Sequence, residues 1–165
     1  MVYAKGDAVV YPMHGAGIIE DFEDKNIDGI CRSYCILRIP IGDLTIMLEA
    51  SSMENVNLRK VMARCDIARV MDDVVKMPPQ PVAGDSSNWN KRYRDNLEKI
   101  KSGLLLDAAM VFRSLYFREK QRGLSSAEKK MLSNVKKIML SEIMLSYNVE
   151  KPEAEEILEK SMAAV

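Results

Sequence analysis

Hydrophobic and polar positions follow two different periods along the chain. Up to about residue 60, apolar residues occur in short runs, some of them alternating, and glycine-containing turns separate the runs. A period of two is typical of β-strands, so we predict a small, strongly bent antiparallel sheet or open barrel. Such a sheet keeps edge strands that can accept a strand from a partner. The predicted strands cover residues 7–11, 18–22, 30–39, 44–48 and 56–58.

Alternation within two of these strands predicts which side chains face the core. The polar segment 23–29 is predicted to be the loop that joins the second strand to the third. In the fourth strand Thr45 and Met47 are expected to point outward. The side chains predicted to share the inner face are Cys31, Cys35, Leu37 and Ile39 in the third strand and Leu44, Ile46 and Leu48 in the fourth.

After residue 60, apolar residues recur at three- and four-residue spacing, which is the period of an amphipathic helix. Residues 77–87, with three prolines and a glycine, interrupt this pattern and predict a linker. Ser125 and Glu128 form a capping box at a helix start. The predicted helices cover residues 61–75, 88–102 (capped by Ser87 or Asn88), 104–122, 125–147 and 152–163.

These patterns together predict an α+β chain with two small domains. We expect a β domain with a closing helix over residues 1–76, a proline-rich linker over 77–87, and an all-α helical bundle over 88–165. The length of 165 residues allows one ordinary domain or two small ones and excludes a large multidomain enzyme.

Composition narrows the class of protein. Hydrophobic residues make up 47% and charged residues 29% of the chain, an ordinary balance for a soluble globular protein. No apolar run approaches the roughly 18 residues of a membrane span, and no secretory signal is recognisable. The odd cysteine number, three, does not make a disulfide framework. We expect a reduced, cytoplasmic protein without a membrane partner.

Catalytic and metal-binding patterns are weak in this sequence. His14 is the single histidine, so multi-histidine metal sites are excluded. A zinc site would need His14 together with Cys31, Cys35 and Cys65, and we expect three buried thiols instead. The Gly15-Ala16-Gly17 turn lies between strands and lacks the helix that a phosphate loop requires. We therefore expect neither an enzyme nor a protein with a cofactor or metal.

Charge is unevenly distributed although the net charge is zero. Residues 1–85 carry 9 basic and 13 acidic side chains, whereas residues 86–150 carry 13 basic and 7 acidic ones. Such asymmetry suggests a polyanionic partner for the basic part. On charge alone, a solvated helical surface is the favoured alternative.

The basic segment begins with the only tryptophan, Trp89. A flat apolar side chain among cations suits distorted nucleic acid, because cations neutralise phosphates while the ring props open a base step. The alternative is that Trp89 covers the loop before its helix. Neither contact type needs base identity, so we expect junction recognition without a sequence code. The candidate nucleic-acid contacts are Trp89, Lys91, Arg92 and Arg94, and Lys129 and Lys130 beside the capped helix start.

Several segments resemble the bacterial CarD/CdnL transcription factors. The resemblance runs in order along essentially the whole chain, with the linker in the same place. The matching segments are Gly6-Asp7-Ala8-Val9-Val10-Tyr11-Pro12-Met13-His14-Gly15, Gly42-Asp43-Leu44-Thr45, Asn88-Trp89 with Tyr93, Asn96-Leu97-Glu98-Lys99, and Arg122-Gly123-Leu124-Ser125 with Glu128-Lys129.

This resemblance implies a function in transcription. The β half would be a Tudor-like domain that docks on the β subunit of bacterial RNA polymerase. The helical half would touch promoter DNA at the upstream edge of the melted −10 region, without sequence specificity, and so stabilise the open complex. The family's minor-groove wedge falls on Trp89. Its basic DNA contacts fall on Lys91, Arg94, Lys129 and Lys130, with Arg92 beside them.

The resemblance also places polymerase contacts on the β half. They include Lys25, which is predicted in the loop after the second strand, and the fourth strand with Thr45 and Met47. Met47 stands where the family has an arginine, so an apolar contact would replace a bidentate salt bridge. We expect a monomer. The alternatives are an RNA- or ribosome-binding module that uses the basic helical half, and a protein adaptor with a merely solvated basic face.

Overall fold

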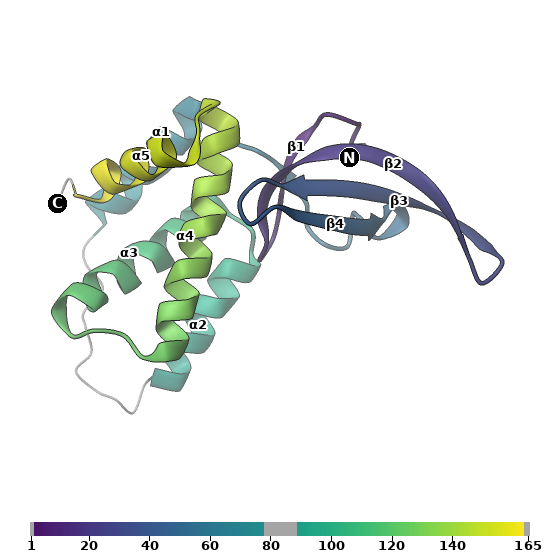
Figure 1. Cartoon of the computed structure of the whole chain (residues 1–165). Coiled ribbons are helices and arrows are strands. Elements are labelled where there is room, and N and C mark those ends of the chain that lie inside the picture. The colour runs from purple at the N-terminus through teal and green to yellow at the C-terminus, as the bar shows by residue number, and fades with distance from the viewer. Residues whose placement is uncertain (1, 78–88, 164–165) are drawn as a thin grey trace.

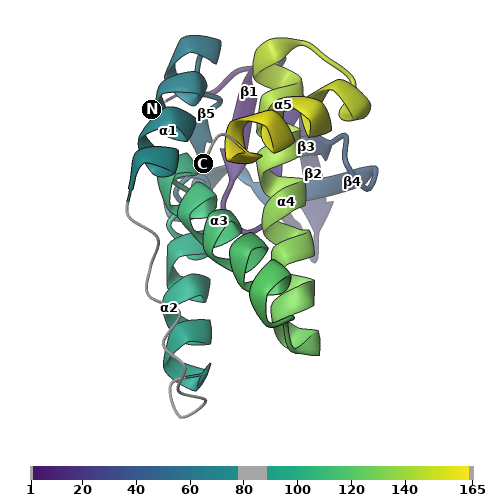
Figure 2. The same ribbon diagram turned by 90° about the vertical axis from the view of Figure 1, so that its left-hand side faces the viewer.

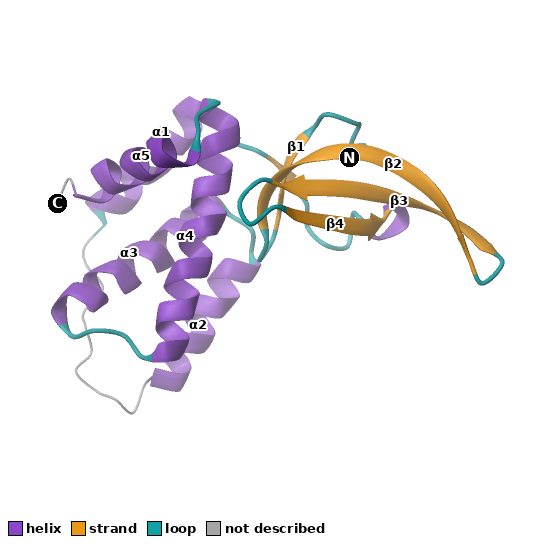
Figure 3. Ribbon diagram, viewed as in Figure 1, coloured by secondary structure: helices purple, strands orange, loops and turns teal. Residues whose placement is uncertain are grey.

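An antiparallel sheet followed by helices forms the molecule, in a computed structural model that describes residues 2–77 and 89–163 (Figures 1 and 3). The strand order in the sheet is β4-β3-β2-β1-β5. The predicted α+β fold is confirmed. The elements are β1 Ala8–Tyr11, β2 Gly15–Ile27, β3 Ile30–Ile39, β4 Leu44–Glu49, the short 3-10 helix Ala50–Ser52, β5 Arg59–Lys60, α1 Arg64–Lys76, α2 Trp89–Lys101, α3 Leu105–Gln121, α4 Ser126–Tyr147 and α5 Lys151–Ala163.

The hairpin of β2 and β3 is longer than predicted. The segment 23–29 is not a loop, because β2 continues to Ile27, which pairs with Ile30. The turn consists of Asp28 and Gly29 alone, with φ values of 54° and 78°. Two consecutive positive φ values are the requirement of a type I′ turn, for which Asp-Gly is a preferred pair. The hairpin extends away from the helices (Figure 1), so its polar residues remain solvated within a strand.

A bulge bends this hairpin. The register between β2 and β3 shifts between Ile19 and Asp21, which leaves Glu20 as the extra residue. Bulges increase the local twist and re-aim the strand. The predicted fifth strand is also displaced: the segment that pairs with β1 is Arg59–Lys60, just after 56–58.

One face of the sheet forms its own hydrophobic core. Val9, Ile19, Cys35, Leu37 and Ile39 are buried there. The predicted inward orientation is thus confirmed for the three residues of β3 at this end of the strand.

Two cysteines and one leucine depart from the prediction. Cys31 and Cys65 are exposed, so the expectation of three buried thiols is wrong for both. Cys31 pairs with Asn26 near the turn of the hairpin, where its neighbours Ile30 and Arg32 are exposed as well. Leu44, at the start of edge strand β4, is 42% exposed although it was predicted to point inward.

Helix α1 packs with the other helices. Its buried residues Ile67, Met71 and Val74 belong to the same core as Leu115 and Val135. The sequence pattern predicts this helix as part of the β domain, but its apolar face lies in the helical core, and the helices begin directly after β5. Of the predicted linker, residues 78–87 lie outside the described residues, as do the proposed caps Ser87 and Asn88.

The buried Arg113 fixes the end of α1. Its Nη1 donates to the carbonyl oxygens of Val74 and Met77, at 2.6 and 2.7 Å. A cation at a helix C-terminus satisfies carbonyls that have no partner in the helix and opposes the negative end of the helix dipole. Arg113 on α3 therefore fixes the point where the chain leaves α1.

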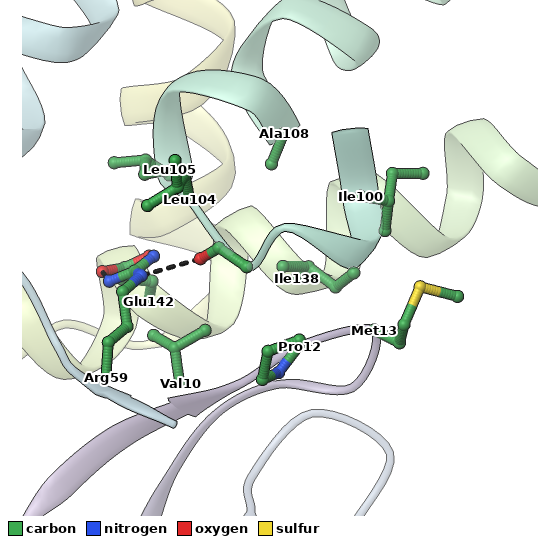
Figure 4. Close-up of a pocket in the computed structure, with 11 residues that line it drawn as sticks. Val10, Pro12, Met13, Arg59, Ile100, Leu104, Leu105, Ala108, Ile138 and Glu142 are labelled. Atoms are coloured by element: carbon green, nitrogen blue, oxygen red, sulfur yellow. Dashed lines mark hydrogen bonds and ion pairs between the residues drawn. The ribbon is translucent and has the colours of Figure 1, made fainter. Parts of the chain in front are cut away.

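The β domain docks on α4 and on the turn between α2 and α3. Arg59 of β5 forms an ion pair with Glu142 of α4, and its Nε donates to the carbonyl oxygen of Gly103 at 2.7 Å (Figure 4). The backbone N–H of Ala16 donates to Ser141 Oγ at 2.8 Å. These polar bonds hold the two domains in one relative orientation.

Candidate functional site

The starts of α2 and α4 lie at the same end of the helical domain (Figures 1 and 2). Trp89, the first residue of α2, is half-buried there and stacks on Tyr93 with a centroid separation of 5.4 Å and an interplanar angle of 17°. Its indole N–H donates to Glu128 Oε1 at 3.1 Å and to Ser125 Oγ at 3.3 Å. The ring thus lies at the surface, between two helix starts.

Glu128 is a buried carboxylate at the centre of this site. Its side chain is 4% exposed. Besides the Trp89 indole it faces Arg92 Nε at 3.4 Å and Arg118 Nε at 3.9 Å. A buried carboxylate is tolerated when cations and hydrogen bonds surround it. Glu128 therefore joins α2, α3 and α4 at one point.

In the sequence, Glu128 is recognisable as a capping residue. That part is confirmed, because Ser125 Oγ accepts a hydrogen bond from the Glu128 N–H and so caps α4. The second role was missed, since it depends on α2 and α3 reaching the same place. The available signal was an acidic residue within a strongly basic segment.

Among the predicted DNA contacts, Arg92 differs from the rest. Its side chain is 21% exposed and turned toward Glu128. Lys91 and Arg94 on α2 and Lys129 and Lys130 on α4 are exposed. Within the described part of the chain, none of these four exposed cations forms an ion pair. Their charge is therefore not neutralised by a neighbouring carboxylate there.

The exposed face of α4 extends this basic surface. Both carboxylates of the helix, Glu128 and Glu142, are buried, so the exposed face carries no negative side chain. Lys137 lies on this face, about two turns after Lys130. Lys137 is not among the predicted contacts, although its seven-residue spacing from Lys130 places both on one helix face. We define the cationic surface as Lys91, Arg94, Lys129, Lys130 and Lys137.

The predicted polymerase contacts all lie on the outer face of the sheet. Lys25 pairs with Arg32, Met47 with Ile36, and Thr45 with Arg38. The three partners alternate along β3 and share one face, so Lys25, Thr45 and Met47 share it too. Lys25 is inside strand β2, not in the loop where it was predicted, because the hairpin is longer.

This sheet face differs in charge from the cationic surface. Its arginines are paired: Arg32 contacts Glu49 at 3.1 Å and Arg38 contacts Asp43 at 2.9 Å. Met47 is 46% exposed, and β4 is an edge of the sheet. An apolar centre within a polar rim, next to an open edge strand, suits a protein partner.

None of the helices in the described ranges combines the length and the apolarity needed to cross a membrane. The four residues of the hypothetical zinc site do not come together either, and His14 instead stacks on Tyr11 at 4.7 Å.

Comparisons with known proteins match both halves of the chain. Residues 3–62 match the family model "CarD-like/TRCF RID domain", and residues 73–159 match the model "CarD, C-terminal domain". A protein of Bacillus subtilis (strain 168), described as "Putative transcription factor YdeB", is 35% identical over 141 residues, which cover 84% of this chain and 88% of that protein.

Proposed function

Because the chain belongs to the CarD family and is thereby a transcription regulator, we propose that it binds RNA polymerase through its sheet and stabilises the promoter open complex through its helical domain. The observation that carries this proposal is the half-buried Trp89 near Lys91, Arg94, Lys129 and Lys130, which form no ion pair with any carboxylate of residues 2–77 and 89–163. The sheet supplies the protein contact, and the cationic surface supplies the DNA contact.

The cations and Trp89 have separate physical roles in this proposal. Lys91, Arg94, Lys129 and Lys130 neutralise phosphates on both sides of the junction, which releases counterions. Trp89 enters the minor groove at the upstream edge of the melted −10 region and stacks on the exposed base step. Unstacking a step costs a few kcal/mol, so a ring that occupies the gap opposes reclosure of the bubble.

The effect on transcription follows from differential affinity. A protein that binds the open complex more tightly than the closed complex shifts the equilibrium toward the open one by that difference. About 1.4 kcal/mol of preference changes the ratio tenfold. The net zero charge of the chain disfavours binding to bulk DNA. The polymerase contact then determines which DNA the helical domain meets.

The docked arrangement of the domains supports this mechanism. Once the sheet is bound to polymerase, the helical domain experiences a high effective concentration of promoter DNA. The Arg59–Glu142 ion pair restricts the directions in which the helical domain can point. Weak intrinsic DNA affinity is then sufficient.

The polymerase contact is proposed on the outer sheet face, through Lys25, Thr45 and Met47 beside edge strand β4, and its partner is the β subunit of bacterial RNA polymerase. The apolar contact of Met47 would replace part of a polar interface. The existing Arg32–Glu49 and Arg38–Asp43 pairs would form its rim.

The test replaces Trp89 by alanine. Trp89→Ala should shorten the lifetime of the promoter open complex about tenfold or more and leave capture by the polymerase β subunit unchanged. An unchanged lifetime would show that the wedge assignment is wrong. Filter binding of forked DNA against structured RNA separates this proposal from RNA binding, because a wedge prefers a junction between duplex and single strand.

A further inference from the structure

The indole of Trp89 is held at two points, and this constrains its plane. Its N–H donates to a charged acceptor, Glu128 Oε1, and its face stacks on Tyr93. Hydrogen bonds to ionised acceptors are roughly twice as strong as neutral ones. A stack alone would allow the ring to slide or to turn over, whereas a directed bond from one edge does not.

The acceptor itself cannot move freely. Glu128 lies in the first turn of α4, and its carboxylate faces Arg92 from α2 and Arg118 from α3. The Ser125 hydroxyl donates to its Oε1 at 3.2 Å. Contacts from three helices therefore fix the position of the carboxylate. The carboxylate in turn fixes the position of the indole N–H that donates to it.

The same hydrogen bond occupies the indole N–H, which is the polar group of the tryptophan side chain. The indole N–H is the single hydrogen-bond donor of this side chain, and it points to Glu128 and Ser125. A ring held in this way meets DNA through its apolar surface alone. It has no donor left with which to read acceptors on base edges in the minor groove.

We infer that Glu128 is a positioning residue for Trp89: it presents the ring to the DNA junction in one fixed orientation and withholds the indole N–H from the bases. The functional part of this inference rests on the proposed wedge. Its benefit is preorganisation, since a ring that is ordered before binding loses less freedom when it binds.

Trp89 is the only tryptophan, so its fluorescence reports on its own environment without labelling. The first experiment compares Glu128→Gln with the control Glu98→Gln, which neutralises an exposed carboxylate of α2, the helix that carries Trp89. In Glu128→Gln one amide oxygen replaces the charged acceptor, and it cannot serve the indole and both arginines together. We expect lower tryptophan anisotropy in the free, folded Glu128→Gln protein and wild-type anisotropy in Glu98→Gln.

The second readout is the lifetime of the open complex. Glu128→Gln should shorten it about fivefold, which corresponds to about 1 kcal/mol. Unchanged anisotropy in folded Glu128→Gln would overturn the inference. If Trp89→Ala leaves the lifetime unchanged, the proposed function fails, but the anisotropy of the free protein still decides whether Glu128 holds the ring.

A third variant covers the case in which Glu128→Gln does not fold. Trp89→Phe keeps a flat apolar ring and leaves Glu128 with its arginines and Ser125, but removes the N–H donor. The open-complex lifetime of Trp89→Phe should fall most of the way to that of Trp89→Ala. A wild-type lifetime in Trp89→Phe would show that the bond to Glu128 is not needed.

Discussion

Arg59 and Glu142 form a two-point ion pair that joins the last strand of the sheet to helix α4. Arg59 Nη1 donates to Glu142 Oε1 at 2.7 Å, and Nη2 donates to Oε2 at 2.8 Å. The Glu142 side chain is 1% exposed, and the backbone N–H of Met62 donates to its Oε1 at 3.0 Å. Every oxygen of this buried carboxylate thus has a partner from the β-domain side of the interface.

We predict that Glu142→Gln destabilises the protein strongly. Removing one partner of a buried ion pair leaves the other charge uncompensated, which typically costs about 3–5 kcal/mol. The measurement is the free energy of unfolding from urea denaturation. Arg69→Gln serves as control, since its pair with Asp66 is exposed, and its effect should be under about 1 kcal/mol. Equal losses in the two variants would show that the ion pair does not hold the domains together.

Two glycines in left-handed backbone offer a matched test of the domain interface. Gly15 has a φ of 108°, and a Cβ there would lie 2.7 Å from Ser141 Oγ. Gly29 has a φ of 78° and no neighbour within 4 Å of such a Cβ. Both alanine variants carry the backbone strain of about 1–2 kcal/mol. Gly15→Ala also pushes Ser141 away from the Ala16 N–H.

Gly15→Ala should therefore lose clearly more unfolding free energy than Gly29→Ala. It should also speed hydrogen exchange at the Ala16 amide, because the new methyl group disturbs the hydrogen bond from this amide to Ser141. If both variants lost the same stability and exchange at Ala16 did not change, the close contact between the domains would be contradicted.

The cationic surface makes a prediction about salt. In filter binding to forked DNA, Lys129→Gln, Lys130→Gln and Lys137→Gln should each lower the slope of log affinity against log salt concentration by about 0.9. The decrease should be the same for different DNA sequences, because phosphates carry the contact. Lys160→Gln on α5, away from the starts of α2 and α4, is the control and should leave the slope unchanged. A wild-type slope in Lys137→Gln would show that Lys137 does not contact phosphate and that the DNA contact on α4 is limited to the helix start.

The sequence predicts the local parts of this structure and misses the parts made by distant residues. Alternation in β3 predicts the burial of Leu37 and Ile39, and the Ser125 cap predicts where α4 begins. The Arg59–Glu142 pair joins residues 83 positions apart, and no local pattern indicates it. Polar residues at 23–26 suggest a loop, because an exposed hairpin has no buried face to create an alternation.

The candidate site shows the same division. A basic segment that begins with Trp89 is visible in the sequence, and four of its predicted contacts, Lys91, Arg94, Lys129 and Lys130, are exposed. The orientation of Arg92 toward Glu128 is not visible, because it depends on how α2 crosses α4. The charged residues are therefore visible in the sequence, whereas their exposure and their partners are visible in the structure alone.

The three cysteines should differ in the rate at which their thiols react. Burial raises the pKa of the Cys35 thiol, whereas Cys31 and Cys65 are exposed. A raised pKa keeps the thiol protonated as pH increases, and the thiolate is the reactive form. With a disulfide reagent at pH 8, we expect two fast-reacting thiols and one slow thiol that reacts fast only after unfolding. Three equal rates would contradict the burial of Cys35.

Met47 on the outer sheet face is expected to contribute to the polymerase contact. Met47 lies opposite Ile36, between the Arg38–Asp43 and Arg32–Glu49 pairs. If this side chain is buried by the polymerase β subunit, Met47→Gln should weaken the complex about tenfold to a hundredfold, because burying a methionine contributes about 1.5–3 kcal/mol.

Pull-down and titration with the β subunit measure this loss. Leu104→Gln is the control, since Leu104 is a 54% exposed apolar residue before α3 on the helical domain, and it should bind as wild type. Met47→Arg introduces a bidentate donor at the same place, and tighter binding would show that the polymerase surface retains a carboxylate there. Wild-type affinity in both Met47 variants would show that Met47 makes neither an apolar nor a charged contact with the β subunit. The docking surface would then lie elsewhere on the molecule.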